Sequence, residues 1–175
     1  MTDKAILSID PGSKGYLCLR YNQEFTYYPI EDNDLYQLSQ IMANIRLQYS
    51  NLICCIECVH AIHLSAASAT FSFGFNVGSL HGLLAANKIP FVEVQPKIWQ
   101  KCVWSNKDEV ATYKNVVIKN KETTRKEVNT KQTSINCAKR LFPLIDFRKN
   151  DKCKNIHDGK VDATLIGEYA RRNNL

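Results

Sequence analysis

The feature that most constrains the fold is the stretch ILSIDPGSKG (residues 6–15), where a short apolar run ends on a carboxylate and a tight turn. Because the apolar residues are nearly continuous, the pattern predicts a central strand buried on both faces. A Pro-Gly turn ends this strand, and Gly15 lets a second strand, residues 16–21, fold back. Asp10 is thus held rigidly at a strand end. That placement suits a metal ligand, and it equally suits an Asp that only caps a turn.

The bulk properties indicate one soluble globular domain over residues 1–175, with no internal repeat or linker. No apolar run reaches the roughly 18 residues that cross a membrane, and the N-terminus lacks the pattern of a secretion signal. We therefore expect an intracellular protein with no membrane partner. The cysteines number seven, and several lie in apolar runs. These features favour buried thiols in a reducing compartment over a disulfide framework.

Periodicity and turn residues predict the remaining elements. Strands are expected at 24–30, 51–58 and 89–94, and helices at about 33–50, 65–87, 130–142 and 157–172. Asp32 or Asn33 is expected to cap the first of these helices.

The helix expected at 65–87 carries two patterns. Its large apolar residues are expected to face the core, and its glycines recur every four residues, which would let another backbone approach closely. Both a dimer seam and a tight contact with the sheet fit that spacing. The apolar residues are Phe71, Phe75, Leu80, Leu83 and Leu84, and the glycines are Gly74, Gly78 and Gly82.

The net charge of +6 is concentrated in residues 97–131, which contain nine Lys and Arg residues but four Asp and Glu residues. Such a segment suits a polyanionic partner, although a solvated lysine-rich loop has the same composition. Residues 103–129 show no clear period. We expect a mobile basic segment there, with a short strand or helix at most.

Three further carboxylates occupy unusual positions. Glu57 ends a strongly apolar strand, where an unpaired buried charge costs several kcal/mol unless it shares a cation; an exposed strand end would make it harmless. Asp158 and Asp162 are four residues apart, so a helix stacks them on one face, where they repel unless a cation lies between them. Asp158 equally suits a helix cap. With Asp10, these oxygen ligands suit Mg²⁺ or Mn²⁺. Two such ions about 4 Å apart can hydrolyse a phosphodiester.

The order of these motifs resembles the RuvC family, and more closely the RuvC-like resolvases of phages and related mobile or organellar elements. The resemblance covers roughly residues 4–21, 51–101 and 130–172. Its most specific part is the final block, KCKNIHDGKVDATLIGEYARR; the other motifs are IDPG, a strand ending in IE, FSFGFNVGSLHGLL, VQPKIWQK and TKQTSINCAKRLFP.

The resemblance implies an α/β ribonuclease-H-like fold, with a five-stranded mixed sheet that begins with three antiparallel strands and has helices on both faces. It implies a homodimer that binds four-way (Holliday) DNA junctions and nicks two strands symmetrically, using two Mg²⁺ ions per site, for which Mn²⁺ would substitute. The metal-binding and catalytic carboxylates would be Asp10, Glu57, Asp158 and Asp162. Residues implied to contact DNA are Lys97, Lys101, Lys131 and His60.

Two positions depart from the family pattern. The last two acidic residues are three apart in the best-known members but four apart here, so either Asp158 or His157 fills the fourth position; we favour Asp158. After the strand-end Glu57, where some members place an aromatic residue that stacks on bases, this chain has His60.

Other readings are weaker. Cys55 and Cys58 have CxxC spacing near His60 and His63, but no second cysteine pair matches for zinc. An actin-like or kinase-like ATPase would need a second similar domain. A DNA-binding module without activity would lack carboxylates that are present here. A nuclease of the same fold that acts on flaps, forks or RNA–DNA hybrids is the main alternative, because the metal site does not choose the substrate.

Overall fold

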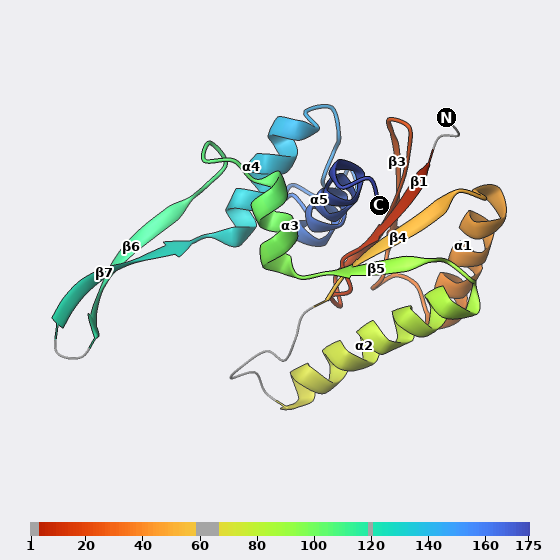
Figure 1. The fold of residues 1–175 in the computed structure, drawn as a ribbon, viewed down its shortest axis with the longest axis horizontal. Coiled ribbons are helices and arrows are strands. Elements are labelled where there is room, and N and C mark those ends of the chain that lie inside the picture. The colour runs from red at the N-terminus through yellow and green to blue at the C-terminus, as the bar shows by residue number, and fades with distance from the viewer. Residues whose placement is uncertain (1–3, 59–66, 119–120) are drawn as a thin grey trace.

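The structure, a computed structural model, describes residues 4–58, 67–118 and 121–175. A mixed sheet of five strands in the order β3-β2-β1-β4-β5 forms its centre (Figure 1). The first three strands are antiparallel, and the last two run parallel to β1. Their bounds are Ala5–Ile9, Tyr16–Tyr21, Glu24–Pro29, Leu52–Glu57 and Phe91–Val94. The predicted five-stranded mixed sheet, which begins with three antiparallel strands, is confirmed.

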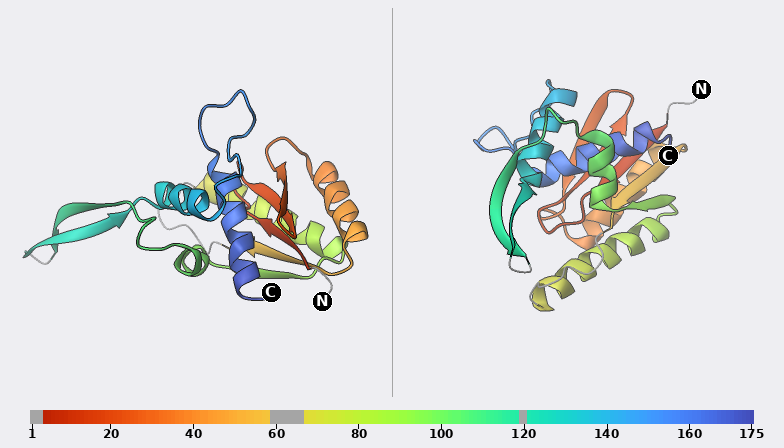
Figure 2. Two further views of the ribbon diagram at one scale, coloured as in Figure 1. Left: turned by 90° about the horizontal axis from the view of Figure 1, so that it is seen from above. Right: turned by 60° about the vertical axis from the view of Figure 1, so that its left-hand side comes forward.

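Helices cover both faces of the sheet, as the two views of Figure 2 show. α1 (Leu35–Gln48) and α2 (Ala67–Ala86) pack on one face, over a core that includes Leu7, Ile9 and Ile56. The opposite face carries α3, α4 and α5, over a core built on Ile6, Cys55 and Trp99. Their bounds are Pro96–Val103, Thr130–Leu141 and Asp158–Arg172. β1 is buried along its whole length because both layers cover it, as its apolar run predicted.

Two expectations about the first two helices are wrong. α1 is capped by Asp34, not by Asp32 or Asn33, because Gln37 three residues later completes a reciprocal capping box with it. In α2, Phe71 and Phe75 do not face the core: they are 74% and 57% exposed. The sheet covers only the C-terminal half of α2, so its first turns extend beyond the core (Figure 1).

The expectation of at most a short strand or helix in 103–129 is also wrong. β6 (Ala111–Ile118) and β7 (Lys121–Val128) form a separate two-stranded antiparallel sheet. This ribbon projects from the end of the molecule at which β4 and β5 finish (Figure 1). The mobility that we expect of this segment stays a prediction.

Two general expectations bear on the chain's environment. All seven cysteines are free thiols, and four of them are buried. Among the described helices, none combines the length and apolar character needed to span a membrane.

Candidate active site

Two carboxylates meet at the carboxyl ends of neighbouring parallel strands. The register pairs Ile9 of β1 with Ile56 of β4, so the next residues, Asp10 and Glu57, lie at the same edge of the sheet. The amide of Gly12 donates a hydrogen bond of 3.1 Å to Oδ1 of Asp10 and fixes its side chain above the turn. The first strand and the Pro-Gly turn therefore orient Asp10 as the sequence predicted.

The first turn of α5 brings the other two carboxylates to this edge. Asp158 begins α5, and Asp162 follows one turn later on the same face. Gly159 permits the approach, because a Cβ there would lie 2.3 Å from the carbonyl oxygen of Lys14 and 3.1 Å from Oδ2 of Asp10. A larger residue at position 159 would push the helix away from the turn that holds Asp10.

Burial and mutual charge raise the pKa values of three of these carboxylates. Burial raises the pKa of Asp10 to about 6, and the charge of Asp158 adds to the effect. Burial raises the pKa of Glu57 to about 7, with a further contribution from Asp10. Asp162 is affected most: burial, then the charges of Asp10, Glu57 and Asp158, raise its pKa to about 8. Each shift disfavours the ionised carboxylate, which is the pattern expected of acidic groups that share a desolvated site.

Neutral or basic side chains from α3 and α4 interact with three of the carboxylates, Glu57, Asp162 and Asp158. Trp99 is buried in α3, and its indole N–H donates a hydrogen bond of 2.7 Å to Oε1 of Glu57. The hydroxyl of Ser134 in α4 faces the same cavity as Asp162 and partly counters the rise in the pKa of that carboxyl. Lys131, one helical turn before Ser134, forms an ion pair with Asp158.

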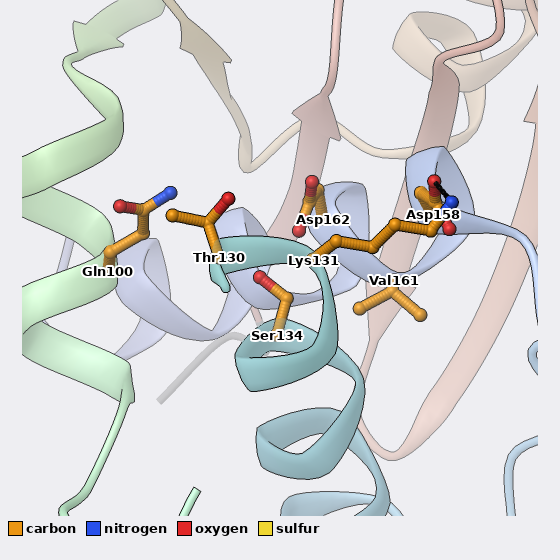
Figure 3. A pocket seen from close by; sticks show the side chains of 7 residues that line it. All are labelled: Gln100, Thr130, Lys131, Ser134, Asp158, Val161 and Asp162. Carbon is orange, nitrogen blue, oxygen red and sulfur yellow. Dashed lines mark ion pairs between the residues drawn. The ribbon is translucent and has the colours of Figure 1, made fainter. Parts of the chain in front are cut away.

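A cavity of about 120 Å³ opens between α3, α4 and α5 (Figure 3). Figure 3 shows Asp162 at its centre and Lys131 extending across the mouth to Asp158. The lining residues are Gln100, Thr130, Lys131, Ser134, Asp158, Val161 and Asp162.

The donor set fits a hard divalent cation. Oδ1 of Asp162 is buried without any hydrogen-bond partner, which is costly for a carboxylate oxygen unless a cation approaches it. The same cation would stabilise the ionised form of the carboxylates whose pKa values are raised. In the described ranges, however, no three His, Cys, Asp or Glu side chains already form a ready-made chelate. Binding an ion would therefore require these side chains to move closer together.

His157 and Asp158 point to different surroundings. The ring of His157 packs edge-on against Tyr16, with centroids 4.9 Å apart, and its Nε2 lies 4.0 Å from Glu31. Asp158 instead faces Lys131 and couples to Asp10. This geometry agrees with our preference for Asp158 as the fourth site residue, which remains a prediction.

The predicted DNA-binding residues are spread around this edge. Lys97 and Lys101 are exposed on α3, and Lys131 lies at the cavity mouth. His60 falls outside the described residues, as does His63, which the zinc reading needed. Of that reading's cysteines, Cys55 is buried within β4.

Sequence reasoning missed Trp99 and Ser134 as partners of the carboxylates. The sequence offered one signal: a buried Trp has an indole N–H that needs a hydrogen-bond acceptor, so Trp99 predicts an acceptor close to it. Its partner Glu57 is 42 residues away, and only the fold joins them.

Comparison with known proteins defines the fold class. No family model and no curated protein matches the sequence. Among solved structures, T. thermophilus RuvC in complex with a Holliday junction substrate matches with a TM-score of 0.56 and 10% identity, over 97% of this chain and 96% of that chain. A further Thermus thermophilus RuvC structure has a TM-score of 0.49 and 9% identity over the same shares. The first match shows that the chain has the ribonuclease-H-like fold of RuvC.

Proposed function

We propose that this protein is a Mg²⁺-dependent endodeoxyribonuclease that resolves four-way DNA junctions by paired, symmetric nicks. The observation that supports the proposal is the placement of four carboxylates near one edge of a RuvC-type sheet: one just after β1, one at the end of β4 and two in α5. The solved structure with this fold was captured with a Holliday junction substrate, which favours branched DNA as the ligand class.

Asp10, Glu57, Asp158 and Asp162 would hold two Mg²⁺ ions, with Mn²⁺ as a substitute. When bound, such ions lower the pKa of a water molecule and neutralise charge on the scissile phosphate. The chain's own groups position these ligands: the Gly12 amide holds Asp10, and Trp99 holds Glu57.

The reaction is an in-line displacement at phosphorus. A water oxygen forms the new P–O bond, the bond from phosphorus to the 3′ oxygen breaks, and the products are a 5′-phosphate and a 3′-hydroxyl. The proton lost by water leaves through solvent or a neighbouring base, and the 3′ oxygen takes up a proton. Lys131, released from Asp158, would place its ammonium beside the phosphate at the cavity mouth.

Lys97, Lys101 and Lys131 would contact phosphates that flank the cleaved bond, and His60 would stack on a junction base. Phosphate contacts release counterions, so affinity should fall steeply with salt concentration. A flat salt response would contradict this part of the proposal.

A homodimer supplies the two sites that paired nicks require. Phe71, Gly74, Phe75, Gly78 and Gly82 lie at i, i+3, i+4, i+7 and i+11, along one face of α2. In the described structure a Cβ at any of these glycines would meet nothing within 4 Å, and both phenylalanines are exposed. This apolar, close-approach face suits a second copy of the helix. Gly78→Glu should convert a dimeric mass in sedimentation equilibrium to a monomeric one, whereas a monomeric wild type would contradict the dimer.

The decisive test is a cleavage assay with Mg²⁺ on four-way, three-way, flap, fork and RNA–DNA hybrid substrates of matched sequence. Two symmetric nicks on the four-way junction would support the proposal. Preference for flaps, forks or hybrids would assign the same chemistry to another substrate and overturn the junction specificity.

The fourth ligand can be tested separately. Asp158→Asn should abolish cleavage, and His157→Ala should retain it. Loss of cleavage only in the His157 variant would reverse our assignment.

A further inference from the structure

The β6–β7 ribbon has no evident structural purpose within the fold. It forms a separate sheet, and Figure 1 and the left view of Figure 2 show it extending away from the body. Two-stranded ribbons are at best marginally stable in water, because they bury little apolar surface. Described side chains on it, including Tyr113 at 69% exposure, face solvent. A long exposed ribbon of this kind is more readily explained by a partner than by stability.

Charge on the ribbon indicates a polyanionic partner. Residues 111–128 contain five Lys and Arg residues against two Glu residues. The register pairs the basic residues Lys114 and Arg125 at one level of the ribbon. Two basic residues at one level suit a row of phosphates. Near the base of the ribbon, Lys126 instead forms an ion pair with Glu109.

The dimensions of the ribbon suit a DNA groove. The major groove of B-DNA admits a two-stranded β-ribbon, whereas the minor groove is about half as wide. Each strand has eight residues. At about 3.3 Å per residue such a strand spans about 26 Å. Duplex DNA rises about 3.4 Å per base pair, so this span corresponds to about eight base pairs.

The base of the ribbon is fixed to the helix that borders the cavity. Asp108 is 2% exposed, and Arg140 of α4 donates two hydrogen bonds of 2.7 Å to its carboxylate. Asn136 of α4 donates to the carbonyl of Asp108 at 3.1 Å, and the hydroxyl of Thr133 accepts from the amide of Val110, also at 3.1 Å.

The same helix carries the cavity residues Lys131 and Ser134. The root of the ribbon therefore has a set position relative to the carboxylates, and a groove-bound ribbon would hold one duplex arm at a fixed distance from the cleaved bond.

We propose that the β6–β7 ribbon enters the major groove of a duplex arm and thereby determines where along that arm the strand is cut. This inference rests on the proposed function, since it assumes that the site cleaves DNA. Its binding component is tested on intact duplex without cleavage, so the two can fail independently.

The main variant is Lys114→Glu/Arg125→Glu. It replaces a pair of basic residues in the register with a pair of acidic residues, so the ribbon still carries two like charges at that level and only their sign changes. A second variant replaces residues 114–125 with Asn-Gly, a two-residue hairpin turn that preserves the pairing of Tyr113 with Lys126. Binding is measured by fluorescence anisotropy in Ca²⁺, on four-way junctions with long arms and with arms cut to about six base pairs, too short to fill an eight-base-pair contact.

On long arms, both variants should bind at least about tenfold more weakly, and the slope of log affinity against log salt should fall by about two for the charge reversal. Wild-type protein should bind short-armed junctions more weakly than long-armed ones by a similar factor. The variants should bind short-armed and long-armed junctions with nearly equal affinity. Dimethyl sulfate should show guanine N7 positions, which face the major groove, protected by wild type and exposed with the variants. In Mg²⁺, the variants should shift the nick positions along the arm.

Affinities, salt slopes and N7 protection equal to wild type would overturn the inference. So would an equal loss on long and short arms. A fall in oligomeric mass in the shortened variant, with N7 protection unchanged, would assign the ribbon to a second copy of the chain instead. If N7 protection and arm-length dependence hold but wild-type protein cleaves no junction, the proposed function fails while the ribbon's contact stands.

Discussion

Replacing Asp162 with Asn should make the protein more stable when no divalent cation can bind. Burial and the charges of Asp10, Glu57 and Asp158 raise the pKa of Asp162 from 3.8 to about 8. The folded protein therefore holds a proton between about pH 4 and pH 8 that the unfolded chain releases. The unfolding free energy falls as pH rises through this window, and the cost is fully present above pH 8. Asn carries no charge and escapes that cost.

The magnitude follows from the shift. A change of about four pKa units corresponds to ~5 kcal/mol at most, since one unit is ~1.36 kcal/mol. Relaxation and water penetration give protein sites an effective dielectric constant near 20, so we expect ~2 kcal/mol for Asp162→Asn. In a domain of this size that is a rise in Tm of about 4–8 °C.

Thermal melts in EDTA at pH 5 and pH 8 provide the assay. Asp162→Asn should melt above wild type at pH 8 and by a much smaller margin at pH 5, where only the first part of the window between the unfolded and folded pKa values has been crossed. Asp151, a fully exposed carboxylate, supplies the control, and Asp151→Asn should change neither melt. Saturating Mg²⁺ should then stabilise wild type more than the variant, because a bound ion favours the native state. A variant that melts at or below wild type at pH 8 in EDTA would refute the reasoning.

Three further predictions use other contacts. Asp10→Asn and Glu57→Gln should each abolish Mg²⁺-dependent cleavage yet retain junction binding in Ca²⁺; loss of both in a gel assay would indicate misfolding. Trp99→Phe removes the N–H held by Glu57, so the Mg²⁺ concentration at the midpoint of thermal stabilisation should rise about 10–100-fold; an unchanged midpoint would show that this bond does not position the ligand. Arg140→Met leaves the buried carboxylate of Asp108 with only its neutral partner Ser105 and should cost ~3 kcal/mol in urea denaturation at pH 7. Because Arg140 lowers the pKa of Asp108 to about 2, that difference should shrink as pH falls from 4 towards 2; a pH-independent difference would contradict the charge contribution.

The sequence predicted the parts of the fold that local patterns encode. The apolar run before Asp10, the run before Glu57 and the stripe of α5 each produced an element of the expected type, because burial on one or two faces leaves a clear period. Their convergence followed from a resemblance, since no local pattern shows that Glu57 and Asp162 share a site.

The failures have physical causes. Residues 111–128 cover no core, so neither strand of the ribbon shows the apolar alternation by which strands are recognised. Phe71 and Phe75 read as core residues because periodicity gives the spacing of a helix face but not what lies opposite it. α3 was not predicted, although Pro96 lies in its first turn, a position that Pro favours.

A crystal structure of the protein soaked in Mn²⁺, examined by anomalous scattering, tests the central claim most directly. The account predicts anomalous peaks at the edge of the sheet, coordinated by Asp10, Glu57 and Asp162, with Asp158 turned away from Lys131. Saturating Mn²⁺ that gives no peak there, or peaks only elsewhere on the surface, would contradict it.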